Sequence, residues 1–326
     1  MISTEAPFFG LNEGALARLE PLLRKPEDYK VLVRRCNTGA TIIDAGIDAV
    51  GGLNAGLELA AICLANRANV ILGSGPKEVW EGAWVSIASD WPILACMASQ
   101  YAGWNLSHGK FFAMGSGPMR AAAAKEELLK DLAICESARR VVGVLETRKL
   151  PPDEVIELIS QACRVSPHEV FLVVAPTASY AGTVQVVARS VETALHKLHE
   201  LGFDLNCVES AWGTAPLPPI AKDDLSAIGW TNDAVLYGAS VCLWANTTDQ
   251  AIEEVIEKVA SAASPDYGRP FLEIFEAANR DFYKIDPMLF SPAKVMICNR
   301  RTGHNFSAGV ENPQVLRESF LGKRRI

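Results

Sequence analysis

The residues best suited to do chemistry gather in one stretch of the chain, residues 183–203, which reads TVQVVARSVETALHKLHELGF. At about 100° per residue, its apolar positions fall on one side of a helix: Val184, Val187, Val191, Leu195 and Leu198. A second side, about 120° away, carries only polar residues: Gln185, Arg189, Glu192, His196 and His199. The spacing therefore predicts a single helix that buries its apolar side and stops near Gly202.

The polar side of this helix has three interpretations. It could be a solvated face with one ion pair between Arg189 and Glu192, worth about 0.3–0.5 kcal/mol. Glu192, His196 and His199 could bind a metal, although three ligands on one helix without H-E-x-x-H are a weak zinc pattern. Alternatively, Glu192 could be a general base whose pKa and orientation Arg189 sets. The pattern alone favours the solvated face and leaves the other two open.

Composition excludes several classes of protein. The chain has 326 residues and a formal net charge of −7, and its longest basic run is residues 323–325, so a nucleic-acid partner is not expected. No apolar stretch approaches the roughly 20 residues that cross a bilayer, and the N-terminus lacks the features of a signal peptide. We therefore expect a cytoplasmic protein without a membrane span. Its eight scattered cysteines form no C-x-x-C pair, which favours reduced thiols over a disulfide framework.

Strand-like and helix-like segments alternate along the chain, which predicts the α+β (mixed α/β) class. Residues 29–37 and 41–47 have the pattern of two strands close enough to pair antiparallel. The length suggests two domains, with one large domain as the alternative. We expect an N-terminal α/β part, residues 1–170, and a C-terminal α/β part, residues 171–326, which contains the helix described above.

The tetrapeptide GSGP occurs twice in the N-terminal part, at residues 73–76 and 115–118, each time after an apolar strand and before an expected helix. Exposed amides at the helix start, with Lys77 in one copy and Arg120 in the other, could hold an anion. The alternative is a pair of tight strand-to-helix turns. Neither copy is G-x-G-x-x-G or a P-loop, which disfavours a dinucleotide oxidoreductase. The sequence also lacks the G-x-S-x-G elbow of serine hydrolases.

Longer stretches resemble the methenyltetrahydromethanopterin cyclohydrolase family along the whole chain. The central one is FLVVAPTASYAGTVQVVARSVETALHKLHELGFD, at residues 171–204. Supporting stretches are ASDWPILACMASQYAGW, FFAMGSGPMRA, LETRKLPPDEVIELI, WGTAPLPPIAKDD, GWTNDAVLYG and SPAKV. They follow in order and are far more specific than GSGP alone.

The resemblance implies hydrolysis of N5,N10-methenyl-tetrahydromethanopterin to the N5-formyl form in cytoplasmic one-carbon metabolism. It also implies two mixed domains with the pterin in the cleft between them, a homotrimer, and no metal or redox cofactor. The family's proposed catalytic arginine and glutamate lie in a stretch that reads ARSVE here, so these roles carry over to Arg189 and Glu192.

Further residues are weaker candidates for pterin contacts, and for each of them capping or turn formation is an alternative. They are Asp90, which could pair with the pterin 2-amino group, and Ser116, Gly117, Arg120, Thr177, Ser179, Asn232 and Asp233. Two other functions stay open: a pterin-binding protein without turnover, and a cyclohydrolase acting on a related folate-type substrate.

Overall fold

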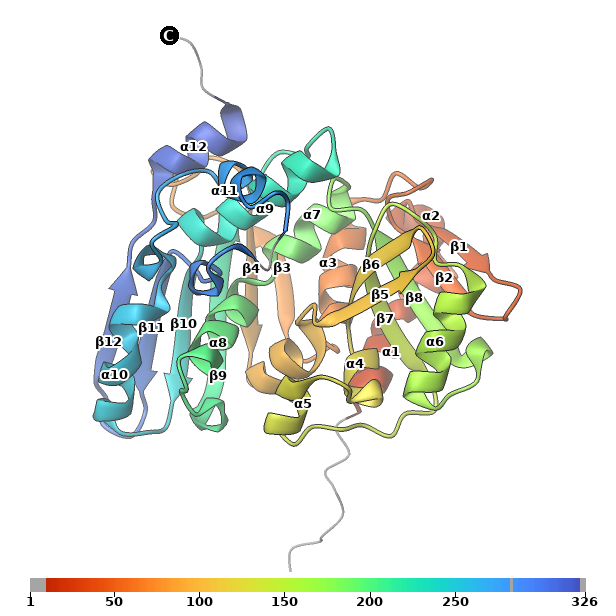
Figure 1. Cartoon of the computed structure of the whole chain (residues 1–326), viewed down its shortest axis with the longest axis horizontal. Helices are drawn as coiled ribbons and strands as arrows, with labels where there is room; N and C mark the ends of the chain where they lie inside the picture. The colour runs from red at the N-terminus through yellow and green to blue at the C-terminus, as the bar shows by residue number, and fades with distance from the viewer. Residues whose placement is uncertain (1–9, 282–283, 323–326) are drawn as a thin grey trace, which may run out of the picture.

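The computed structural model describes residues 10–281 and 284–322. They form two six-stranded sheets that lie side by side, with helices between and around them (Figure 1). Parallel and antiparallel strands occur in both sheets, which confirms the α+β class. Residues 1–9, on which the expectation of no signal peptide depends, lie outside the described residues.

The first sheet has the strand order β1-β2-β8-β7-β6-β5. Its strands are β1 (Leu32–Arg35), β2 (Thr41–Asp44), β8 (Val170–Ala175), β7 (Val141–Glu146), β6 (Phe111–Ser116) and β5 (Trp104–His108). The central strands β2, β8 and β7 are parallel, and β1, β6 and β5 add antiparallel pairs at the two edges. The predicted antiparallel pairing of residues 29–37 with 41–47 is confirmed by β1 and β2.

The parallel strands of the first sheet are almost continuously apolar because helices cover both of their faces. On one face, Leu59 of α3 (Leu53–Cys63) joins a buried cluster with Val144 of β7. On the other, Ile159 of α6 (Asp153–Cys163) is buried in a cluster with Leu145.

The second sheet has the order β12-β11-β10-β9-β4-β3. Its strands are β12 (Asn305–Gly309), β11 (Lys294–Asn299), β10 (Ser240–Ala245), β9 (Val208–Pro216), β4 (Trp84–Ser89) and β3 (Asn69–Gly73). Only β10 and β11 are parallel neighbours. Helices α8 (Ser190–Glu200) and α10 (Asp249–Val259) pack on its inner face. Trp212 and Trp244 point to the outer face, where they are 38% and 39% exposed.

Central helices connect the two sheets. α3 contacts β7 of the first sheet and β3 of the second, and packs along α7 (Tyr180–Val187) between them (Figure 1). The remaining helices are α1 (Leu11–Arg24), α2 (Pro26–Tyr29), η1 (Ile93–Gln100), α4 (Met119–Ala123), α5 (Glu127–Asp131), η2 (Pro167–Glu169), η3 (Leu205–Cys207), α9 (Asp224–Gly238), η4 (Ser261–Ala263), α11 (Phe271–Ala277), η6 (Pro287–Leu289) and α12 (Pro313–Leu321).

The order of the strands along the chain interleaves the two sheets. β3 and β4 come early in the sequence, yet β4 pairs with β9, which begins at Val208. The second sheet thus contains strands from both sides of the expected division near residue 170. The division into two domains stays a prediction.

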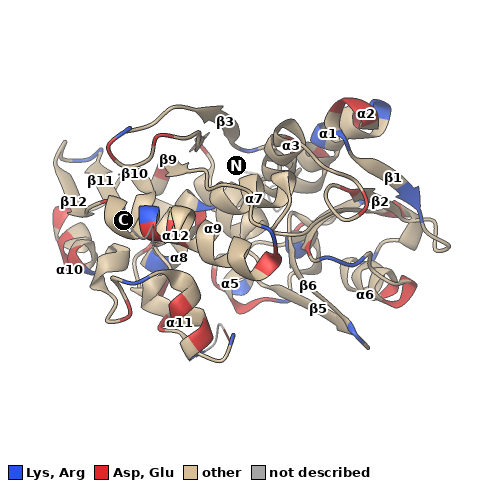
Figure 2. Ribbon diagram, turned by 90° about the horizontal axis from the view of Figure 1, so that it is seen from above, with Lys and Arg blue, Asp and Glu red and all other residues tan. Residues whose placement is uncertain are grey.

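The distribution of charged residues and the state of the cysteines can be compared with the expectations from composition. Acidic and basic residues are interspersed on the helices (Figure 2), and no helix within residues 10–281 and 284–322 is long and apolar enough to cross a membrane. All eight cysteines lie in described segments as free thiols, which agrees with the expectation of reduced cysteines.

Candidate active site

Residues 183–203 fold as two helices rather than one. α7 ends at Val187 and α8 begins at Ser190, and Arg189 between them has φ −91° and ψ 8°. The Arg189 amide donates to the Val186 carbonyl at 3.1 Å, three residues back rather than four, which tightens the last turn and ends α7. The prediction of a single helix is therefore wrong, because the apolar period continues through the break although the backbone does not.

The burial of the polar side tests whether it is a solvated face. The five apolar residues of the other side are fully buried, as predicted: Val184, Val187, Val191, Leu195 and Leu198. However, Gln185, Arg189 and Glu192 are also buried, with exposed fractions of 2%, 8% and 5%. A solvated face is thus excluded for these three residues, and half-buried His196 and His199 complete the polar side.

Arg189 is held by acceptors from four other elements. Its Nη1 donates to the Gln100 carbonyl at 2.7 Å. Its Nη2 donates to Gln185 Oε1 at 3.1 Å and to Ser116 Oγ at 3.3 Å, and Cys63 Sγ lies 4.0 Å away. A guanidinium with this many fixed partners has one position and a fixed charge.

Glu192 lies in the first turn of α8, with its Oε2 3.9 Å from Arg189 Nη1. None of the described residues donates a hydrogen bond to its carboxylate. Burial raises the pKa of Glu192 to about 7, against the opposing effect of Arg189 and Arg120. A carboxyl group with a pKa near neutrality and free lone pairs is suited to general base catalysis.

A π-helix supplies part of this environment. η1 begins two residues after Trp91 and ends at Gln100, and the Tyr101 amide donates to the Cys96 carbonyl five residues back at 2.8 Å. π-helical turns are rare and are frequent at functional sites. The Gln100 side chain donates to the Ala188 carbonyl at 3.0 Å, so η1 supports both the backbone and the guanidinium at the break between α7 and α8.

The second GSGP turn brings Ser116 and Arg120 to the same site. Gly117 has φ +90°, which favours glycine, and its amide donates to the Ser99 carbonyl at 2.8 Å. Arg120 is completely buried; it pairs with Glu126 and donates to the carbonyls of Met97 and Ser99. These partners occupy the guanidinium, so the structure favours a packed turn over an anion site at this copy.

The first GSGP does not lead into a helix, so that prediction is wrong. Residues after Pro76 form turns, in which the amides of Val79 and Trp80 both donate to the Pro76 carbonyl at 3.1 Å. Trp84 lies against Gly75, where a Cβ would come within 2.3 Å of its ring. This packing explains the second glycine of the motif without a ligand.

Two candidates before α7 make local structural contacts. Ser179 caps α7 by accepting a hydrogen bond from the Gly182 amide at 3.0 Å. Thr177 donates to the Glu146 carboxylate at the ends of β7 and β8. These contacts match the capping alternative for Ser179 and leave the predicted pterin contacts of both residues untested.

The other three candidates contact neither Arg189 nor Glu192 among the hydrogen bonds of the described residues. Asp90 accepts from Ser210 Oγ at 2.8 Å, and Asn232 donates to the Ile228 carbonyl at 2.8 Å. Asp233 is fully buried and accepts from the Phe271 amide at 2.8 Å and from Ser319 Oγ at 2.5 Å. Asp233 thereby ties α9 to α11 and α12, which is a structural role.

The two histidines have separate partners. His196 stacks on Tyr101 with ring centroids 4.9 Å apart, and its Nε2 lies 3.8 Å from Glu200. His199 lies 3.7 Å from Asp131. Among the residues with described positions, no group of three or more His, Cys, Asp and Glu side chains is arranged to hold a metal ion.

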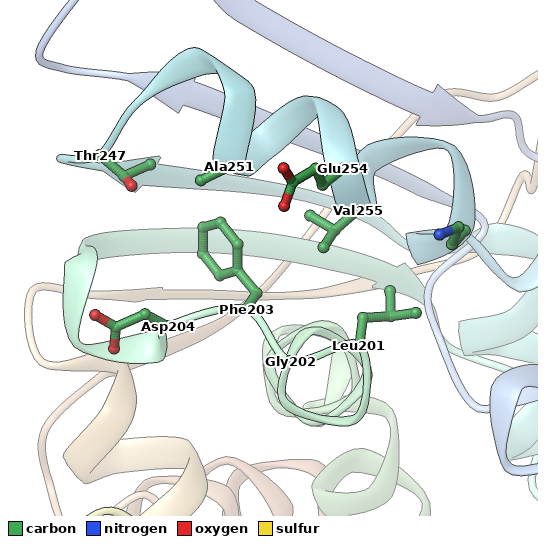
Figure 3. A pocket seen from close by; sticks show the side chains of 9 residues that line it. Leu201, Gly202, Phe203, Asp204, Thr247, Ala251, Glu254 and Val255 are labelled. Carbon is green, nitrogen blue, oxygen red and sulfur yellow. The ribbon is translucent and has the colours of Figure 1, made fainter.

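Three surface hollows of the described structure lie away from the side chains of Arg189 and Glu192. The hollow in Figure 3, about 690 Å³, lies between the end of α8 and α10, where Phe203 points toward α10. Two others, of about 600 and 460 Å³, lie near α2 and the start of α3. None of these three is lined by Arg189 or Glu192, so the chemistry of the side chains and not the volume identifies the candidate site.

Sequence reasoning missed three contributors to the site: Cys63, Gln100 and Tyr101. The Gln100 contribution to Arg189 is a backbone carbonyl, which leaves no residue-type signal. Burial, with the charge of Glu192 as a smaller contribution, raises the pKa of Tyr101 to about 12. Both Gln100 and Tyr101 fall within the stretch ASDWPILACMASQYAGW, whose resemblance to the family was the available signal.

Comparison with known proteins identifies the family of the chain. The family described as "Cyclohydrolase (MCH)" matches residues 10–320. The methenyltetrahydromethanopterin cyclohydrolase of Methylobacillus flagellatus is 48% identical over 92% of this chain and 91% of its own length. The protein of the same name from Xanthobacter autotrophicus is 44% identical, over 97% of this chain and 94% of its own. That from Methanosarcina mazei is 41% identical, over 97% and 99%. The chain therefore belongs to the methenyltetrahydromethanopterin cyclohydrolase family.

Proposed function

We propose that this chain hydrolyses N5,N10-methenyl-tetrahydromethanopterin to N5-formyl-tetrahydromethanopterin, with Glu192 as general base and Arg189 as its orienting partner. The relatives' names support the reaction. The observation that carries the catalytic roles is the geometry at Glu192: a buried carboxylate 3.9 Å from a fixed guanidinium, with no hydrogen-bond donor from the described residues.

The chemistry of the substrate fits such a carboxylate. The methenyl carbon lies between two nitrogens and carries delocalised positive charge, so it is already electrophilic. A water oxygen attacks this carbon, and Glu192 takes one of the water's protons as the C–O bond forms. Glu192 can then return that proton to N10 as the C–N10 bond breaks. The hydroxyl proton leaves as the formyl C=O forms, so one proton is released per turnover.

Arg189 has a defined part in this scheme. Its charge opposes the effect of burial on Glu192, so that the carboxylate ionises near neutral pH rather than remaining protonated. Without this neighbour, a carboxylate this deeply buried would hold its proton. Arg189 thus keeps the base available without forming a tight ion pair with it.

The two alternative functions make different predictions in one assay. The assay follows loss of methenyl absorbance on adding enzyme to the methenyl forms of tetrahydromethanopterin, its dephosphorylated form and tetrahydrofolate. We expect turnover with a methanopterin substrate. Binding without turnover would identify a pterin-binding protein, and preference for the tetrahydrofolate form would identify a folate-type enzyme.

Assembly and location are further proposals. We expect a homotrimer in the cytoplasm, acting without a metal or redox cofactor. The outer face of the second sheet supports association between copies, because Trp212 and Trp244 lie exposed on neighbouring strands. Light scattering should give a mass three times that of one chain, and a monomer in solution would contradict the trimer. Dialysis against a chelator should leave turnover unchanged.

A further inference from the structure

The spacing of Arg189 and Glu192 is unusual for an ion pair that is buried. Charge-assisted N–H···O bonds to a carboxylate typically span about 2.7–2.9 Å, and arginine often makes two of them at once. Here the closest approach is 3.9 Å. Something must therefore hold the guanidinium away from the carboxylate, because mutual attraction in a poorly hydrated site favours contact.

The restraint comes from the acceptors that Arg189 already has. Nη1 donates one hydrogen bond to the Gln100 carbonyl, and Nη2 donates to Gln185 and Ser116, so both ends of the guanidinium are anchored. Gln185 lies on α7, four residues before Arg189 and on the far side of the helix break from Glu192. Its Oε1 thus fixes Nη2 toward α7, while Glu192 is carried by α8. Gln185 is 2% exposed, so water does not compete with this bond.

We propose that Gln185 is a positioning residue that tethers the Arg189 guanidinium away from Glu192 and so leaves the carboxylate free to accept a proton from water. This proposal rests on the base role proposed above for Glu192. Gln185 contacts Arg189 and acts through it, without a role in bond making.

The groups around Glu192 make Arg189 the decisive neighbour. Cys63 on α3, Cys96 on η1 and Tyr101 after η1 all interact with Glu192, but burial raises the pKa of each and keeps it neutral. The charges that act on Glu192 are those of Arg189 and, less strongly, Arg120. Arg120 is anchored by Glu126. The position of Arg189 therefore sets how readily Glu192 ionises.

The test compares two substitutions at Gln185 that should have opposite effects. The measurement is the pH dependence of kcat/KM, whose acidic limb reports the ionisation of the essential base in the free enzyme. Gln185→Leu removes the acceptor, so Arg189 closes on Glu192 and stabilises its charged form. We expect the limb to move to lower pH by about one unit and kcat to fall roughly tenfold. Gln185→Glu keeps an acceptor and adds a negative charge, so the limb should move to higher pH.

Each result has a distinct meaning. An unchanged limb in both variants, with melting curves showing a folded protein, would overturn the tether and leave a purely structural role for Gln185. A limb that moves the same way in both variants would also overturn it. If Gln185→Leu does not fold, Ser116→Ala removes the other acceptor of Nη2, and its limb must move to lower pH. Glu192→Gln run beside them separates the proposals: near-normal turnover in that variant contradicts the base itself, rather than the tether.

Discussion

Glu192 and Asp233 are two buried carboxyl groups with the same electrostatic signature and different surroundings. Burial raises the pKa of each to about 7. Both oxygens of Asp233 accept hydrogen bonds, from the Phe271 amide and from Ser319 Oγ. The carboxylate of Glu192 accepts no hydrogen bond from the residues described, and its ion-pair partner Arg189 lies 3.9 Å away.

The difference shows that a raised pKa does not identify a catalytic base. Asp233 joins three helices through its two hydrogen bonds and is fully buried, so its oxygens do not face solvent. The carboxylate of Glu192 is held in place without a hydrogen-bond donor among the described residues. Burying it in this way costs stability and joins no elements of the fold. A buried carboxylate without hydrogen-bond donors among the described residues makes Glu192 a candidate for function, and the raised pKa adds weight only after the contacts are known.

The largest effect should come from Glu192→Gln. Because Glu192 is the proposed general base, its replacement should lower kcat by about 10²–10⁴-fold. The folded protein should lose little stability, because none of the described residues donates a hydrogen bond to the carboxylate. Steady-state turnover of the methenyl substrate, with a urea unfolding curve on the same sample, checks both halves. Near-normal turnover would remove Glu192 from the mechanism.

Asp233→Ala should give the opposite outcome. It leaves the Phe271 amide and the Ser319 hydroxyl without their acceptor, which should cost about 2–4 kcal/mol of unfolding free energy. Turnover per folded molecule should stay close to that of the original chain. A large loss of kcat in the folded fraction would show that Asp233 belongs to the site, as its place among the pterin-contact candidates first suggested.

The pH dependence of stability should be shared by the two groups. Each folded-state pKa lies above its ordinary value, so each group's contribution to stability is complete below that ordinary value and is lost as pH rises toward about 7. The unfolding free energy should therefore decline over this window by up to about 1.4 kcal/mol per pH unit for each group. Glu192→Gln and Asp233→Asn should each make the decline shallower, whereas only the first should change the pH dependence of turnover. Equal slopes in all three proteins would contradict the raised pKa values.

The smallest effect should follow Ser319→Ala, which frees one oxygen of Asp233. The loss of one buried hydrogen bond should cost about 1 kcal/mol. Turnover should not change, because Asp233 makes no hydrogen bond to Arg189 or Glu192 among the described residues. Melting temperatures and kcat of the variant and the original chain provide the check. A fall in kcat larger than the loss of folded protein would contradict a purely structural role for this hydrogen bond.

The sequence was informative where the signal is local. The apolar side of residues 183–203 and the pairing of β1 with β2 follow from short-range periodicity. The proposal that Arg189 and Glu192 are the catalytic pair came from the stretch ARSVE and the family it resembles. The break at Arg189 was not predictable, because one amide bonding to Val186 instead of a residue further back leaves the apolar period intact.

Burial of the polar side depended on distant segments. Gln100 and Ser116 come from η1 and β6, more than 70 residues before Arg189, and nothing in the local pattern shows that they will cover it. The same limit applies to β4, whose partner β9 lies far along the chain. Long-range pairing of this kind has no short-range signature.

The interleaved strand order has a consequence for biosynthesis. The hairpin of β3 and β4 is complete at Ser89, yet the strand that covers its inner edge starts only at Val208. At translation rates of about 5–20 residues per second, the nascent chain waits roughly 6–24 s for that strand. During this interval an unpaired β edge emerges from the ribosome, and such edges invite intermolecular aggregation. Slowed elongation or a shortage of chaperones should therefore reduce the yield of folded protein, without changing the activity of each molecule that folds.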